Sequence, residues 1–170
     1  ESLLERCKPE YEIQVAEQFH LKPMYQAIKK IIDKGIIGEP YFVNMSVAHD
    51  YHGMSLIRFF LNAYDEPVKI SDCSSISPIF HTNFRNGEVE NKKIQNSVHT
   101  IKVFGFSGKT AVYDFENEQY FSPIRTDRLL IRGDRGEIEN DTVRYFNDKN
   151  EFVESRIVQH KSGNLDGFFN

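Results

Sequence analysis

The sequence predicts an α+β domain with one predominantly antiparallel, open sheet and helices packed on one face of it. Three observations lead to this prediction. Residues 23–62 contain two segments of helical periodicity around one strand, and the chain from residue 68 onward alternates as strands between turns. Strand 94–106 carries apolar residues on both faces, yet the helices can cover only one face. We therefore expect a homodimer or homotetramer that associates through the open sheet face.

The first expected helix begins at Pro23, where a missing N–H costs little, and ends before Gly35, which suits a left-handed cap. Its apolar stripe consists of Met24, Ala27, Ile28, Ile31 and Ile32. A strand over 41–48 follows, and then a second helix over 53–62 whose polar stripe is Ser55, Arg58 and Asn62. Ahead of these elements, residues 2–7 are predicted to be helical and residues 13–19 to form a strand.

The remaining expected elements are strands joined by short turns. Ser107-Gly108 and the run 148–150 are typical of hairpin turns. The expected strands are 68–77, 94–106, 109–118, 128–133, 137–139, 142–147 and 151–159.

Composition narrows the class of protein. The chain has 170 residues, 39% hydrophobic and 27% charged, as in globular domains. A net charge of −4 with a pI near 5.9 gives no reason to expect nucleic acid or an anionic membrane as a partner. No apolar run approaches the roughly 20 residues that span a bilayer. Cys7 and Cys73 are far apart and are interpreted as reduced thiols of a cytoplasmic protein.

His52 is the first candidate for chemistry because it lies where a strand gives way to a helix. The N-terminus of a helix offers free N–H groups and favours the neutral imidazole, which can accept a proton. Oxidation of an alcohol requires such a proton acceptor. The alternative is a histidine that caps the helix or packs in the core.

Two further sets of residues have weaker functional interpretations. His49 and His52 are of metal-ligand type, but in an extended segment they point to different faces and no further ligand is near, so we expect no metal site. Arg125, Arg128, Arg132 and Arg135 form a basic run in an acidic chain. This run could hold an anion, but a solvated strand face explains it more simply.

Four short motifs in order carry a family resemblance. They are Q-F-H-L-K-P at 18–23, G-I-I-G-E-P at 35–40, H-G-M-S-L-I-R at 52–58 and R-L-L-I-R-G-D-R-G-E-I at 128–138. Over about residues 11 to 160, the chain resembles the C-terminal domain of the Gfo/Idh/MocA oxidoreductases, which are NAD(P)-dependent dehydrogenases of sugars, inositol and related compounds.

The resemblance implies that residues 1–19 are the last helix and strand of a Rossmann domain and that 20–170 form a substrate-binding and oligomerising domain. Neither G-x-G-x-x-G nor E-K-P occurs in this sequence, so NAD or NADP would be bound mainly by the missing N-terminal domain and the segment alone would be inactive. The substrate would be a small polyol or sugar. The resemblance makes His52 the catalytic residue, places Gln18 near the cofactor, and places His20, Tyr51 and Asp50 near the substrate.

The sequence departs from the family pattern beside His52. Many members have D-x-x-x-H, but Ala48 stands in the place of that aspartate, and Ser55 stands where H-x-x-D has its acid. Either His52 works with the lysine of the missing domain alone, or catalysis has been lost or rearranged. The second function class is therefore a non-catalytic ligand-binding or assembly protein that retains the fold.

Overall fold

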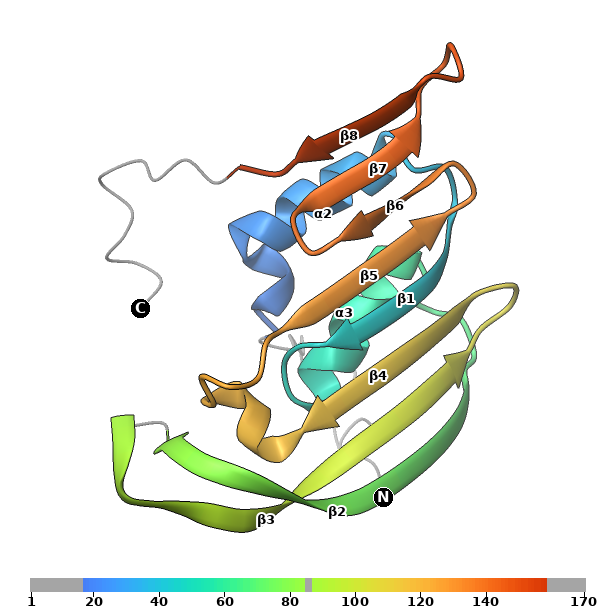
Figure 1. Ribbon diagram of the computed structural model, residues 1–170. Helices are drawn as coiled ribbons and strands as arrows, with labels where there is room; N and C mark the ends of the chain where they lie inside the picture. The colour runs from blue at the N-terminus through green and yellow to red at the C-terminus, as the bar shows by residue number, and fades with distance from the viewer. Residues whose placement is uncertain (1–16, 85–86, 159–170) are drawn as a thin grey trace, which may run out of the picture.

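The computed structural model describes residues 17–84 and 87–158, which form one eight-stranded sheet with helices on one side (Figure 1). The strand order is β2-β3-β4-β1-β5-β6-β7-β8, and only the central β1–β4 pair is parallel. The elements are η1 (Phe19–Leu21), α2 (Pro23–Asp33), β1 (Pro40–Ser46), α3 (Asp50–Leu61), β2 (Lys69–Phe84), β3 (Gly87–Gly105), β4 (Thr110–Glu116), η2 (Asn117–Tyr120), β5 (Arg128–Gly133), β6 (Gly136–Glu139), β7 (Thr142–Phe146) and β8 (Phe152–Arg156). The predicted α+β class is confirmed.

Helix α2 has the predicted boundaries, with Pro23 in its first turn. Gly35 adopts a φ of +68° just after the helix. Its N–H donates to the carbonyl of Ile32 at 2.8 Å, and the N–H of Ile36 donates to the carbonyl of Ile31 at 3.2 Å. These two bonds satisfy carbonyls that the end of a helix otherwise leaves unpaired, which is why the glycine stands there.

The predictions for residues 2–19 are mostly untested. The helix expected at 2–7 and most of the strand expected at 13–19 lie outside the described residues. The end of that strand is wrong, because Phe19 begins η1 and its carbonyl accepts the N–H of Lys22 at 3.1 Å.

The core lies between the sheet and the two helices. Strand β1 faces the helices with Val43 and Met45, which stand opposite Ile131 and Leu129 of β5. The buried helix residues that face them are Ile28 and Ile32 of α2 and Leu56, Ile57 and Phe60 of α3. At about 25 cal/mol per Å², such burial is the main stabilisation of the fold.

Helix α3 begins three residues earlier than predicted. Ala48 turns the chain with a φ of +60°, and His49 then serves as the extended N-cap. The N–H groups of His52 and Gly53 both donate to the carbonyl of His49, at 2.8 and 3.1 Å. Strand β1 accordingly ends at Ser46, before residue 48, and His52 lies inside the first helical turn rather than ahead of it.

The motifs at 35–40 and 128–138 meet at the end of the sheet where β1 begins. The N–H of Arg135 donates to the carbonyl of Ile37 at 3.0 Å, and Asp134 Oδ1 accepts the N–H of Glu39 at 3.0 Å. A Cβ on Gly133 would lie 2.1 Å from the Ile37 carbonyl oxygen. These glycine motifs therefore join the turn after α2 to the β5–β6 hairpin, which is a structural role.

The open sheet face is more polar than expected. Ile101 and Val103 alternate with buried Phe104 and remain 42% and 40% exposed. The basic run makes ion pairs or carbonyl contacts: Arg125 with Glu116, Arg128 with Asp114, Arg132 with Glu137, and Arg135 with the carbonyls of Phe146 and Asn147. This agrees with a solvated strand face.

Among the residues described, no helix has the length and apolar character needed to cross a membrane.

Tyr25 of α2 makes the fold sensitive to alkali. Burial, and then the nearby Asp127 and Tyr120, raise the pKa of its phenol from 10.0 to about 12. The unfolded chain ionises near pH 10 while the folded chain keeps the proton, so the stabilisation is complete below pH 10 and is lost as the pH rises towards 12. We expect Tyr25→Phe to reduce the loss of unfolding free energy between pH 10 and 12 by up to about 3 kcal/mol. Urea denaturation at several pH values measures this, and an unchanged slope in the variant would contradict it.

Candidate functional site

The predicted catalytic histidine is held by a carboxylate. His52 Nδ1 lies 2.6 Å from Glu17 Oε2, and the two side chains are 18% and 10% exposed. The second oxygen of Glu17 accepts the N–H of Phe19 at 2.7 Å. Both oxygens of the carboxylate are therefore engaged, and the imidazole has a defined orientation.

The ring of His52 is also fixed from its sides. It lies 4.2 Å from the Phe19 ring and 4.0 Å from the Tyr51 ring, measured between centroids. A carboxylate bound at Nδ1 accepts the proton of that nitrogen, so Nε2 carries the lone pair. No described residue hydrogen-bonds Nε2. A base oriented by a third group in this way is a common arrangement for proton transfer.

The sequence analysis missed Glu17. It sought an acid at position 48, but Ala48 is buried, its φ is positive, and its carbonyl accepts the Tyr113 hydroxyl at 2.9 Å. The acid comes instead from the segment before η1, 35 residues away in sequence. No helical or strand spacing links these positions, so only the tertiary structure reveals the pair.

The first turn of α3 depends on one small residue. A Cβ on Gly53 would lie 2.5 Å from the Tyr113 ring of β4, so glycine lets the helix approach the sheet closely. The N-cap position belongs to His49, which makes no side-chain capping bond. The alternative interpretation of His52 as a helix cap therefore has no support in the geometry.

The other predicted site residues are spread around this pair. Tyr51 is 67% exposed, and Asp50 is exposed and lies 3.2 Å from Lys102 Nζ. His20 lines a hollow of about 290 Å³ together with Glu17, Ser55, Arg58, Phe59 and Tyr64. Gln18 is exposed at the start of η1. The structure thus brings Tyr51 against His52 and places His20 in the same hollow as Glu17, while the roles of all of these residues stay predictions.

Arg58 from the polar stripe of α3 has a structural role. Its Nη1 donates to the carbonyls of Ala63, Tyr64 and Glu66 at 2.6, 2.8 and 3.0 Å. These bonds hold the chain that leaves α3 and so support one wall of the hollow.

No group of three or more His, Cys, Asp or Glu side chains that could hold a metal occurs within the described ranges. His49 packs on Tyr120 at 4.9 Å and on Phe115 at 5.1 Å, so its surroundings differ from those of His52. Cys73 is an exposed free thiol.

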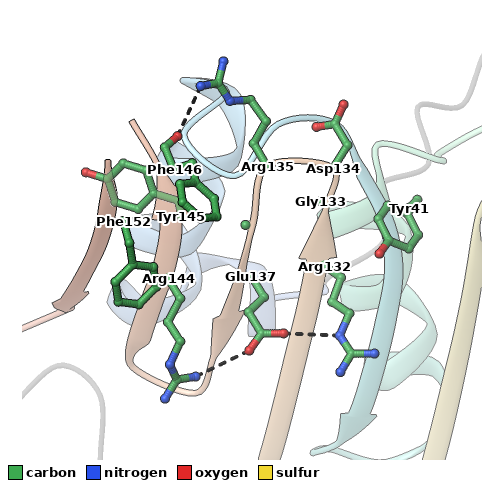
Figure 2. Close-up of a pocket in the computed structure, with 11 residues that line it drawn as sticks. Tyr41, Arg132, Gly133, Asp134, Arg135, Glu137, Arg144, Tyr145, Phe146 and Phe152 are labelled. Atoms are coloured by element: carbon green, nitrogen blue, oxygen red, sulfur yellow. Dashed lines mark hydrogen bonds and ion pairs between the residues drawn. The ribbon is translucent and has the colours of Figure 1, made fainter. Parts of the chain in front are cut away.

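A larger hollow of about 500 Å³ lies at the opposite end of β1 (Figure 2). Figure 2 shows Tyr41 on one side, Phe146 and Phe152 on the other, and Arg132, Glu137 and Arg144 between them. Arg132 and Arg144 both contact Glu137, at 3.2 and 3.5 Å. This hollow shares no residue with the His52 site.

No protein-family model matches the chain, and no curated protein matches it. Solved structures do. An oxidoreductase from Agrobacterium radiobacter in complex with NAD+, L-tartaric acid and magnesium is 16% identical with a TM-score of 0.55, and 86% of this chain covers 46% of that one. Levoglucosan dehydrogenase without ligands is 12% identical with a TM-score of 0.56, at 85% and 47% coverage. An NAD-binding oxidoreductase from Klebsiella pneumoniae is 15% identical with a TM-score of 0.52, at 84% and 46% coverage.

These matches establish the fold. The chain spans just under half the length of the solved structures that it matches. The resemblance to the Gfo/Idh/MocA oxidoreductases is confirmed at this level, because the chain has the fold of one part of NAD-binding oxidoreductases.

Proposed function

We propose that this chain is the substrate-binding and oligomerising half of an NAD(P)-dependent oxidoreductase that acts on a sugar, an inositol or a related polyol. The His52–Glu17 pair in the first turn of α3 carries the proposal. It supplies an oriented proton acceptor although Ala48 replaces the family aspartate, and so favours the enzyme over the non-catalytic binding or assembly protein.

In the proposed reaction, His52 Nε2 accepts the proton of the substrate hydroxyl. The Glu17 carboxylate at Nδ1 orients the ring so that Nε2 is the nitrogen that accepts this proton. A bound nicotinamide cofactor would supply the hydride acceptor. His20, Tyr51 and Asp50 are the proposed substrate contacts around this base.

The comparisons support this substrate class. Levoglucosan dehydrogenase in complex with NADH and levoglucosan matches with a TM-score of 0.53, and its complex with NADH and L-sorbose matches with 0.55. Both ligands are sugars or sugar derivatives with several hydroxyl groups. A small polyhydroxylated substrate is accordingly the class that we propose here.

We propose that this chain contributes little to the cofactor site. The sequence has no G-x-G-x-x-G loop to receive a pyrophosphate, and Gln18 is the one residue that we place near the cofactor. We therefore propose residues 1–19 as the end of a Rossmann domain and 20–170 as the second domain, in a cytoplasmic enzyme. The 170-residue chain alone is expected to show no turnover.

Activity of the full-length protein tests this proposal. Purified parent enzyme, supplied with NAD+ or NADP+ and a panel of sugars and polyols, should form reduced nicotinamide, which is followed by absorbance. Saturable binding of a polyol without any turnover with either cofactor would instead establish the non-catalytic alternative.

Association is the second part of the proposal. Ile101 and Val103 of the open face should contact another copy, so Ile101→Glu should convert a dimer or tetramer to a smaller species in light scattering. Ile70→Glu is the matched control, because Ile70 is also exposed but stands opposite Phe104, on the helix side of the sheet. A monomer in the unmodified protein at tens of micromolar would contradict this part.

A further inference from the structure

The turn between β1 and α3 is strained, and it determines where His52 lies. Ala48 adopts a φ of +60°, in the left-handed region that a Cβ disfavours. The next residue, His49, is the N-cap of α3, and its carbonyl accepts the N–H of His52 at 2.8 Å. A change of conformation at Ala48 would therefore shift the first turn of α3 and move the imidazole away from Glu17.

One buried side chain of the sheet holds this turn. Tyr113 of β4 is 2% exposed, and its hydroxyl donates to the carbonyl of Ala48 at 2.9 Å. The phenol oxygen also interacts with the backbone of Asp50, which is the first residue of α3. The Tyr113 side chain thus contacts the chain on both sides of the N-cap.

The contact between Tyr113 and the turn is close and lasting. A Cβ on Gly53 would lie 2.5 Å from the Tyr113 ring, so the ring packs directly against the first helical turn. Burial, and then the charge of Asp50, raise the pKa of the Tyr113 phenol, so the hydroxyl keeps its proton throughout the range in which a histidine titrates. Within the described part of the chain, no other group donates to the Ala48 carbonyl.

We propose that Tyr113 is a positioning residue of the proposed oxidoreductase: its hydroxyl keeps Ala48 in the left-handed conformation and thereby keeps His52 on Glu17. This inference rests on the proposed function of His52. It follows that the Tyr113 hydroxyl is needed because residue 48 carries a Cβ. A glycine at position 48 would adopt the same φ without that cost and would make the hydroxyl dispensable.

Steady-state kinetics of the full-length protein and its variants test this dependence. Tyr113→Phe should lower kcat/KM about tenfold, because the turn is no longer held and the buried Ala48 carbonyl lacks a donor. Ala48→Gly should stay within about threefold of the unmodified protein, and the double variant should return to that level. Tyr145→Phe is the control, because Tyr145 of β7 lines the hollow at the opposite end of β1.

An NMR measurement tests the position of His52 without any turnover. In the full-length protein, isotopically labelled at the histidine nitrogens, the Nδ1–H that faces Glu17 should give a low-field proton signal. This signal is assigned by its shift in Glu17→Gln. Tyr113→Phe should broaden or shift the signal, and the double variant with Ala48→Gly should restore it. Melting temperatures show whether each variant is folded at the temperature of measurement.

The outcomes separate this inference from the proposed function. Normal turnover of Tyr113→Phe, or an unchanged His52 signal in it, would overturn the inference and leave the function standing. A loss of activity or of fold that Ala48→Gly fails to restore would also overturn it, because Tyr113 would then support the core in general. Absence of turnover in every variant would overturn the proposed function, while recovery of the His52 signal in the double variant would still confirm that Tyr113 positions this histidine.

Discussion

His52→Ala is expected to lower kcat/KM of the proposed full-length oxidoreductase by about 10²–10⁴-fold while leaving cofactor affinity nearly unchanged. The reason is that Nε2 is the proposed proton acceptor, whereas we propose that the cofactor is bound mainly by another domain. His52→Asn should not restore activity, because an amide can hold a hydroxyl but cannot take its proton. Steady-state kinetics with varied substrate and varied cofactor measure both effects.

Variants of Glu17, which binds His52, and of the nearby His49 make this test more specific. Glu17→Gln should lower kcat/KM by less than His52→Ala, because a neutral amide still orients Nδ1 but no longer stabilises the imidazolium. His49→Ala is the matched control, since His49 lies one helical turn away and packs on Tyr120 and Phe115. It should lower the melting temperature and keep kcat/KM. A His52→Ala variant that melts earlier but turns over normally would contradict the catalytic role.

Gly133→Ala is expected to have the largest effect on stability. Its Cβ would lie 2.1 Å from the carbonyl oxygen of Ile37, and the backbone at that point is held by the N–H of Arg135 at 3.0 Å. Since neither side can move freely, we expect the unfolding free energy to fall by about 3 kcal/mol or more. Urea denaturation with a constant m value measures the change.

Gly105→Ala is the matched control for that variant. Gly105 also ends a strand, but its added Cβ would meet Lys69 atoms only at 3.9 Å and beyond. The alanine should therefore change the unfolding free energy by no more than about 0.5–1 kcal/mol, and by reducing the freedom of the unfolded chain it could stabilise the fold. Equal losses of unfolding free energy in the two variants would show that the close approach at Gly133 is not the cause of the loss.

The sequence predicted the elements wherever periodicity and turn residues agreed. Helix α2 is the clearest case, because the Met24–Ile32 stripe, Pro23 and Gly35 all indicate the same boundaries. The β2–β3 hairpin was underestimated, since it extends to Phe84 and resumes at Gly87, whereas strands were expected only over 68–77 and 94–106. Among the described side chains of its distal part, over 78–83 and 87–93, only Ile79 and Thr82 are buried, so this part leaves a weak pattern.

The candidate site was predicted only in part. His52 could be found because the motif places it beside a helix start. The start itself was misplaced, because Ala48 adopts a left-handed conformation that no sequence rule favours for alanine. Glu17 could not be found, because its partnership with His52 joins two segments that only the folded chain brings together.

A crystal structure of the full-length protein with reduced cofactor and bound substrate is the most direct test of the central claim. We predict that His52 Nε2 lies about 2.6–3.2 Å from the reacting hydroxyl, with Nδ1 still on Glu17. A substrate hydroxyl held by other groups, with His52 turned away from it, would contradict the proposed role of this chain in catalysis.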